Sequence, residues 1–194
     1  RTIKYLKKFG INEIIISSGY KSNKIELFLK KKKNFGCQVI FSIEKTPLGT
    51  GGAIKKALKH IDDESFLVLN GDIVTNIDLR RILKKPNTVA ANELKTKFGT
   101  MNIKNNKILK FNEKKDVTNV WMNPGIYHLS KNVERFIPKK GSLEGIVFPK
   151  MARKNALDVV KFKNVLWFSI DSHKDIEECS KEINSKKYSK YFKY

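Results

Sequence analysis

The chain has 194 residues, of which 40% are hydrophobic and 30% charged, and its formal net charge is +21. These proportions exclude a disordered or fibrous chain, and no uninterrupted apolar run is long enough for a membrane-spanning helix, so we expect no membrane partner. The length predicts one domain, 1–194, because it is short for two.

The positive charge comes mostly from lysine and has two interpretations. One is a partner with phosphates, either nucleic acid or a phosphorylated small molecule. The other is a general lysine bias, because lysines occur in every segment and charge runs are usually solvated faces. The densest runs are Lys30–Lys33 and a basic tail at 183–194. Without zinc-finger spacing or an aromatic RNA-binding signature, we do not expect a nucleic-acid partner.

Helical and strand patterns alternate in the first part of the chain. The predicted order is helix 2–10, strand 13–20, helix 21–33 with Ser22 as a candidate cap, strand 37–44, a glycine-rich loop 46–52, helix 53–61 and strand 65–70. The strands are continuous apolar runs, as in sheets that are covered on both faces. This order predicts an α/β fold with a mostly parallel sheet and helices on both faces.

Shorter, more alternating segments follow Asp78. The stretch "MNIKNNKILKF" predicts a hairpin across Asn105-Asn106. A helix over 142–155, interrupted near Pro149, precedes two strands within 156–171 and a closing helix from 172. No repeat, linker or domain boundary interrupts this pattern.

Cys37 and Cys179 have neither metal-site nor redox-motif spacing, and no secretory signal opens the chain. Both features favour a reduced, cytoplasmic protein, although a disulfide stays open. The first residue is Arg1 rather than Met, inside a predicted amphipathic helix. We therefore expect an N-terminally truncated part of a longer protein.

Asp72 follows the predicted strand 65–70, at the sheet edge where open parallel sheets bind ligands. A carboxylate there suits a Mg²⁺ ion that carries substrate phosphates, and Gly71 permits close backbone approach. The alternative is a simple turn in which Asp72 caps the next segment. Gly49 and Thr50 lie in the glycine-rich loop, which predicts backbone amides aimed at an anion or a base edge.

Five segments in order, "GINEIIISSGY", "TPLGTGGAIKKAL", "LVLNGDIVTNIDL", "FNEKKD" and "MNPGIYHLS", resemble the sugar-1-phosphate nucleotidyltransferases, in particular the mannose- and heptose-1-phosphate guanylyltransferases. The resemblance runs from Arg1 to about Glu182. It implies a Rossmann-like, GT-A-like fold with a mixed sheet, and a homo-oligomer is possible. It implies Mg²⁺-dependent joining of a nucleoside triphosphate, with GTP preferred, and a mannose- or heptose-like sugar 1-phosphate into a nucleotide sugar and pyrophosphate.

The resemblance also implies roles for individual residues. Gly49, Thr50 and Gly71 are expected at the nucleotide, Gly99, Glu113, Lys114, Asn123 and Gly125 at the sugar phosphate, and Asp72 and Lys114 in catalysis, with Asp72 also binding the metal. Glu144 matches a family position too, but we interpret it as a helix-start residue. Tyr127 is expected to pack within its strand.

Two departures from the family pattern affect these expectations. The family's N-terminal loop, which ends in Gly-Thr-Arg and wraps the triphosphate, is absent, so the chain is either a fragment, which we expect, or a catalytically inactive regulatory homologue. A basic nucleic-acid-binding domain is the third hypothesis. Ser169 also stands where many relatives carry the second metal-binding Asp. Asp171 is either the replacement ligand or the N-cap of the last helix, with Asp175 in its first turn.

Overall fold

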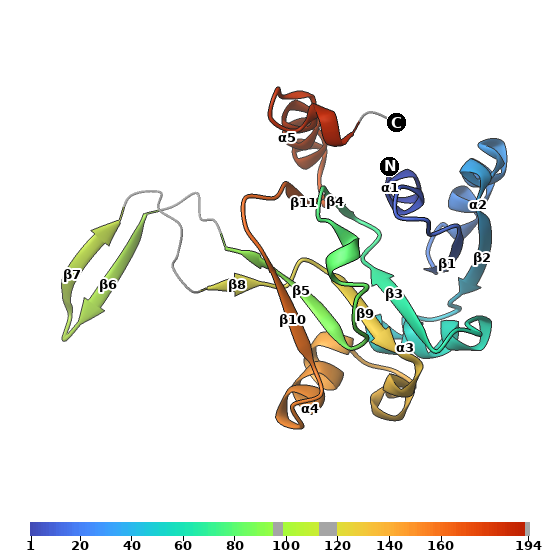
Figure 1. Cartoon of the computed structure of the whole chain (residues 1–194), viewed down its shortest axis with the longest axis horizontal. Helices are drawn as coiled ribbons and strands as arrows, with labels where there is room; N and C mark the ends of the chain where they lie inside the picture. Colours follow the sequence, from blue (N-terminus) through green and yellow to red (C-terminus); the bar gives the residue numbers. More distant parts are fainter. Residues whose placement is uncertain (95–98, 113–119, 193–194) are drawn as a thin grey trace.

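The structure is a computed structural model that describes residues 1–94, 99–112 and 120–192 (Figure 1). Its α-helices are α1 (Thr2–Lys7), α2 (Ser22–Lys31), α3 (Gly49–Ala57), α4 (Phe148–Arg153) and α5 (His173–Asn184). Its strands are β1 (Glu13–Ser18), β2 (Gln38–Ile43), β3 (Ser65–Leu69), β4 (Ile73–Thr75), β5 (Thr88–Glu93), β6 (Thr100–Lys104), β7 (Lys107–Asn112), β8 (Trp121–Met122), β9 (Ile126–Ser130), β10 (Asp158–Phe162) and β11 (Trp167–Ser169). No helix in the described ranges is long and apolar enough to cross a bilayer.

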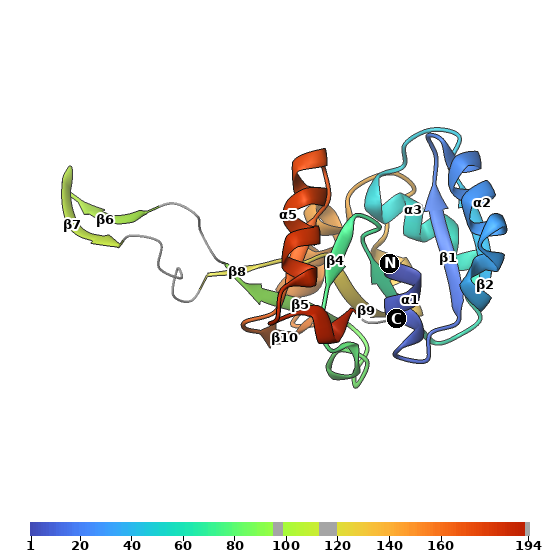
Figure 2. The same cartoon turned by 90° about the horizontal axis from the view of Figure 1, so that it is seen from above.

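The central sheet has the strand order β10–β5–β9–β3, and β8 pairs with one end of β5. β10 is parallel to β5, whereas β9 is antiparallel to both β5 and β3. β10, β5 and β3 therefore run in one direction, and β9 runs in the other. β1 and β2 form a separate parallel pair, with α2 and α3 on opposite sides of it (Figure 2). The predicted mixed, mostly parallel sheet with helices on both faces is confirmed.

Both faces of β9 are buried in hydrophobic clusters. Ile126 is fully buried beside Tyr5 of α1, whose hydroxyl donates to the Ile77 carbonyl oxygen at 2.6 Å. Tyr127, the next residue, faces the opposite side and packs in a second cluster with Met151 of α4. Alternate side chains of a strand point to opposite faces, which explains why neighbouring residues of β9 pack in different clusters. His128, the polar residue buried in the middle of β9, is hydrogen-bonded through Nε2 to the Ser65 hydroxyl at 3.0 Å.

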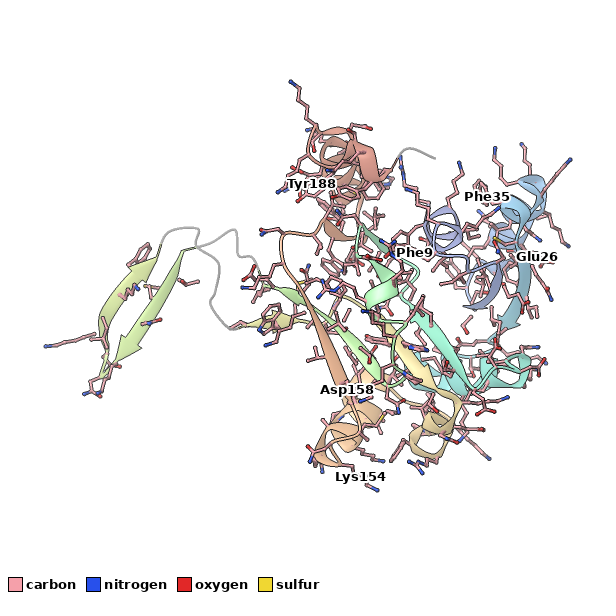
Figure 3. All side chains as sticks on the ribbon, in the orientation of Figure 1. Phe9, Glu26, Phe35, Lys154, Asp158 and Tyr188 are labelled. Carbon is pink, nitrogen blue, oxygen red and sulfur yellow. The ribbon has the colours of Figure 1, made fainter. Side chains whose placement is uncertain are left out.

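A third cluster anchors the C-terminal segment to α5. It combines Cys179 and Ile183 of α5 with Leu166 before β11 and with Tyr188 and Phe192 of the tail. Tyr188 and Phe192 are each only 9% exposed, and Figure 3 shows Tyr188 beside α5. The described part of the predicted basic tail therefore contributes two aromatic anchors to the core. Both cysteines are buried and free.

Two details at helix starts differ from the prediction. Lys21, at φ 55°, is the N-cap of α2, and the Ser22 hydroxyl instead contacts the Ser18 hydroxyl at 2.8 Å. The third helix begins at Gly49 rather than at 53, so the glycine-rich loop forms its first turn. This extension is possible because the segment before α4 packs against these glycines, as described below.

The second half follows the predicted pattern more closely. β6 and β7 form the expected hairpin, and Asn105 and Asn106 adopt φ angles of 50° and 58° at its turn. Figure 1 shows that this hairpin extends away from the rest of the molecule. The helix that we predicted over 142–155 consists of a π-helical turn, Leu143–Val147, followed by α4. The change of helix type lies next to Pro149, which stands in the first turn of α4, as expected.

Candidate active site

Strand pairing places two distant acidic residues at one edge of the fold. Asp72 lies between β3 and β4, and β4 pairs antiparallel with β11 so that Ile73 is opposite Ser169. The amide of Ile170 donates to the main-chain oxygen of Asp72 at 2.9 Å, which extends the pairing by one residue. Asp171 follows immediately. The backbone register therefore brings the segment after β11 alongside Asp72.

One hydroxyl group lies between the two carboxylates. Ser169 Oγ is 3.3 Å from Asp72 Oδ2 and 2.9 Å from Asp171 Oδ2. Both carboxylates are thus within hydrogen-bond reach of the same group. Carboxylate oxygens are the ligands that Mg²⁺ prefers, and one or two of them suffice when substrate phosphates supply further oxygens. In the described residues no group of three or more His, Cys, Asp and Glu side chains could hold a metal ion.

The predicted alternative of a turn is present at Gly71 and Asp72, but among the described residues neither Asp72 nor Asp171 caps a helix. Ser172 is the N-cap of α5, since its hydroxyl accepts from the Asp175 amide and the Asp175 carboxylate accepts from the Ser172 amide. The interpretation of Asp171 as the N-cap is therefore wrong, whereas Asp175 does lie in the first turn. Asp72 precedes strand β4 rather than a helix, whereas Asp78 caps a helical turn through the Arg80 amide.

A glycine turn before β9 packs directly against the Asp72 segment. The Asn70 amide donates to the Gly125 carbonyl oxygen at 3.0 Å. Gly125 has φ 74°, and an added Cβ would lie 2.6 Å from Asn70 Nδ2. Trp167 of β11 donates through Nε1 to the Pro124 carbonyl oxygen at 2.9 Å. The predicted sugar-side residues Asn123 and Gly125 therefore lie at the same edge as Asp72.

Asn123 is held in a fixed orientation by two hydrogen bonds. Its Oδ1 accepts from the Gly125 amide at 2.9 Å, and its Nδ2 donates to the Tyr127 hydroxyl at 2.8 Å. Tyr127 is 1% exposed and donates in turn to Glu144 Oε1 at 3.1 Å. Tyr127 thus packs within its strand as expected, but its hydroxyl also links Asn123 to Glu144.

Glu144 connects this strand to the glycine-rich loop. Glu144 Oε2 accepts from the Thr50 hydroxyl at 2.6 Å and from the Ser142 hydroxyl at 3.0 Å. Thr50 Oγ1 accepts from the Leu143 amide at 2.8 Å. The expected helix-start position is correct, with Ser142 as the N-cap, but it does not describe the main contacts of Glu144. The signal in the sequence was Tyr127, because a buried tyrosine hydroxyl requires a partner.

The surroundings of Glu144 and Tyr127 shift the pKa of both side chains. Burial works against ionisation of Glu144, but hydrogen bonds from Thr50, its own backbone amide, Ser142 and Tyr127 together hold the pKa of the Glu144 carboxyl below its ordinary value. Burial raises the pKa of the Tyr127 hydroxyl, and the hydrogen bond from Asn123 only partly offsets burial and the nearby Glu144 charge. Near neutral pH the pair is therefore a carboxylate and a neutral phenol.

The glycines of the loop serve close packing. The amides of Gly51 and Gly52 both donate to the Gly141 carbonyl oxygen, at 2.9 and 3.3 Å, and the Gly141 amide donates to Leu48. A Cβ on Gly49 would lie 2.7 Å from the Gly141 oxygen. The prediction that the loop amides face an anion is therefore wrong for Gly51 and Gly52, because the 141 segment already occupies these donors.

The remaining predicted residues divide into two groups. Gly71 borders open space, since an added Cβ would meet no atom within 4 Å, and Gly99 lies directly before β6. Glu113 and Lys114 lie outside the described residues. The structure thus brings together Asp72, Asp171, Asn123, Gly125 and, through Tyr127 and Glu144, Thr50.

Comparison with known proteins identifies the family of the chain. The family model described as nucleotidyl transferase matches residues 1–186. The chain is 34% identical over 137 residues to D-glycero-alpha-D-manno-heptose 1-phosphate guanylyltransferase of Aneurinibacillus thermoaerophilus, a match that covers 66% of this chain and 59% of that protein. It is 30% identical over 187 residues to the catalytic subunit beta of mannose-1-phosphate guanylyltransferase of Dictyostelium discoideum, covering 89% of this chain and 52% of that one.

The chain thus spans 52% to 59% of the length of these relatives. Among solved structures, HddC from Yersinia pseudotuberculosis superposes with a TM-score of 0.71 at 29% identity, covering 93% of this chain and 83% of that chain. HddC complexed with GMP-PN also gives a TM-score of 0.71, at 27% identity, and covers 94% and 83% of the two chains. The chain belongs to the sugar-1-phosphate nucleotidyltransferase family.

Proposed function

We propose that the protein joins a nucleoside triphosphate, preferentially GTP, and a mannose- or heptose-like sugar 1-phosphate into a nucleotide sugar and pyrophosphate, with Mg²⁺. The observation that carries the proposal is the convergence of Asp72 and Asp171 on one hydroxyl at the strand-end edge. The names of two relatives as heptose- and mannose-1-phosphate guanylyltransferases support the choice of substrates.

Asp72 and Asp171 would hold the metal, and oxygens of the triphosphate would complete its coordination shell. When bound, Mg²⁺ would neutralise negative charge on the phosphates as pyrophosphate departs. A phosphate oxygen of the sugar 1-phosphate attacks the α-phosphorus, a new P–O bond forms, and the bond to the pyrophosphate breaks. No covalent enzyme intermediate is required, so the task of the protein is to position the two substrates.

The sequence resemblance supports the other roles that we propose. Asn123 and Gly125 would line the sugar side, and Lys114 would bind the sugar phosphate. Thr50 uses its hydroxyl hydrogen for Glu144 and accepts from the Leu143 amide. The backbone of Gly49 and Thr50, rather than the donor of the threonine side chain, would therefore contact the nucleotide.

A catalytically inactive regulatory homologue is the second candidate. Ser169 favours it, because many relatives that the chain resembles carry an acid at this position. In this structure, however, Asp171 lies 2.9 Å from the Ser169 hydroxyl and can supply the missing carboxylate. This contact favours the active enzyme.

Pyrophosphate release tests the proposal. The full-length protein with Mg²⁺ is assayed against four nucleoside triphosphates, each with mannose 1-phosphate or a heptose 1-phosphate, and with Asp72→Asn as the control. The active enzyme should release pyrophosphate with at least one pair, and only when both substrates are present. A full-length protein that binds these ligands without turnover would support the regulatory homologue instead.

A further inference from the structure

A continuous chain of hydrogen bonds crosses the candidate site from the sugar side to the nucleotide side. It runs from Asn123 through Tyr127 and Glu144 to Thr50, with donor–acceptor distances of 2.8, 3.1 and 2.6 Å. These residues come from the turn before β9, from β9 itself, from the turn before α4 and from the first turn of α3. Side-chain contacts therefore join segments that are far apart in sequence at the centre of the site.

Glu144 is the central member of this chain because its two carboxylate oxygens serve opposite sides. Oε1 accepts from Tyr127, which is buried and cannot move without disturbing β9. Oε2 accepts from Thr50 and from Ser142. Hydrogen bonds to an ionised acceptor are shorter and stronger than those between neutral groups. A neutral amide at this position would have one acceptor oxygen and could not accept from all three hydroxyls.

The contact between Glu144 and Thr50 also holds the glycine-rich loop in place. Thr50 donates to Glu144 and accepts from the Leu143 amide, so both functions of its hydroxyl are used within the turn that carries Glu144. The Gly141 carbonyl oxygen holds the next two amides of the loop, from Gly51 and Gly52. A shift of the 141–144 segment would therefore displace the loop, and a shift of Tyr127 would displace Glu144.

We propose that Glu144 is a positioning residue that couples the binding of the two substrates. It does so by holding the glycine-rich loop at Thr50 in a fixed position relative to Asn123 in the turn before β9. The inference rests on the proposed function of the site. A substrate that orders one end of the chain also orders the other end, so the second substrate binds a site that is already arranged. Couplings of this kind typically change affinity about 5- to 150-fold.

The test compares coupling, which a purely structural role would leave unchanged. The dissociation constant of a non-hydrolysable GTP analogue is measured by calorimetry with Mg²⁺, in the absence and presence of saturating mannose 1-phosphate. The ratio of the two constants is the coupling factor. The full-length wild-type protein, Glu144→Gln and Tyr127→Phe are compared with Glu134→Gln, which changes an exposed glutamate outside the site.

We expect a coupling factor of at least about 5 for the wild type and for Glu134→Gln, and a value near 1 for Glu144→Gln and Tyr127→Phe. A folded Glu144→Gln protein with the wild-type factor would overturn the inference while leaving the proposed function intact. If Glu144→Gln does not fold, Tyr127→Phe decides, because it keeps the buried ring and removes only the hydroxyl that links the two sides.

Amide hydrogen exchange on the ligand-free protein separates this inference from the proposed function. Loss of the Glu144 charge should accelerate exchange at Gly51 and Gly52 and, at the other end, at Gly125, whose amide donates to Asn123. Faster exchange confined to 142–145 would overturn the inference. If the wild-type protein binds neither substrate, the proposed function fails, and the exchange result alone decides whether Glu144 links the two segments.

Discussion

Gly125→Ala should lower the free energy of unfolding, for two reasons that can be measured separately. Gly125 has φ 74°, and the left-handed region costs a residue with a Cβ about 1–2 kcal/mol. The added Cβ would also lie 2.6 Å from Asn70 Nδ2 and 2.8 Å from its Cγ. Overpacking of this kind costs about 1–3 kcal/mol, which gives a total loss of about 2–5 kcal/mol in the free energy of unfolding.

Two other glycines separate the cost of the left-handed φ from the cost of the close contact with Asn70. Gly10 has φ 78° but an added Cβ would meet no atom within 4 Å, so Gly10→Ala should lose only the conformational part. Gly71 has neither a left-handed φ nor a close neighbour, and Gly71→Ala should leave stability nearly unchanged. Urea unfolding of the three variants measures the free energies. If Gly125→Ala loses no more unfolding free energy than Gly10→Ala, the contact between Gly125 and Asn70 is not tight, and the reasoning fails.

Three further predictions concern single side chains. Asp72→Asn should abolish Mg²⁺-dependent turnover in the pyrophosphate assay, since it removes a metal ligand, and near-normal turnover would remove Asp72 from the site. Lys114→Ala should weaken the binding of sugar 1-phosphate by calorimetry, and an unchanged affinity would contradict its assigned role. The pKa of Glu144 is lower in the folded protein, so this group adds stability above its unfolded pKa that is lost as the pH falls through the folded pKa. Between about pH 5 and pH 3, Glu144→Gln should therefore lose less of its unfolding free energy than the wild type. Urea unfolding at each pH measures these free energies, and the same decrease with pH in both proteins would refute the prediction.

Local patterns predicted those parts of the fold that depend on neighbouring residues. The apolar run before Asp72 identified the strand and its end, and Asn105-Asn106 identified the hairpin turn, because both signals lie within a few residues. The convergence of Asp72 and Asp171 was harder to predict. It depends on the register of β4 against β11, which is set by long-range packing rather than by either segment alone.

The glycine-rich loop shows why a local motif can predict a position but not a role. The same glycines that would expose amides to an anion also permit close packing, and here Gly51 and Gly52 donate to Gly141. The helix-start interpretation of Glu144 rests on its neighbours in the sequence alone. Its decisive partners, Thr50 and Tyr127, come from two other segments of the chain.

Binding of Mn²⁺, used in place of Mg²⁺ and followed by electron paramagnetic resonance in the presence of GTP, tests the central claim most directly. The wild-type protein, Asp72→Asn and Asp171→Asn are titrated under the same conditions. If Asp72 and Asp171 hold the cation together, each substitution should weaken Mn²⁺ binding by at least about 10-fold, because the loss of a partner that only orients a metal ligand already costs about 10- to 100-fold. Wild-type affinity in Asp171→Asn would contradict the claim that the two carboxylates form one metal site.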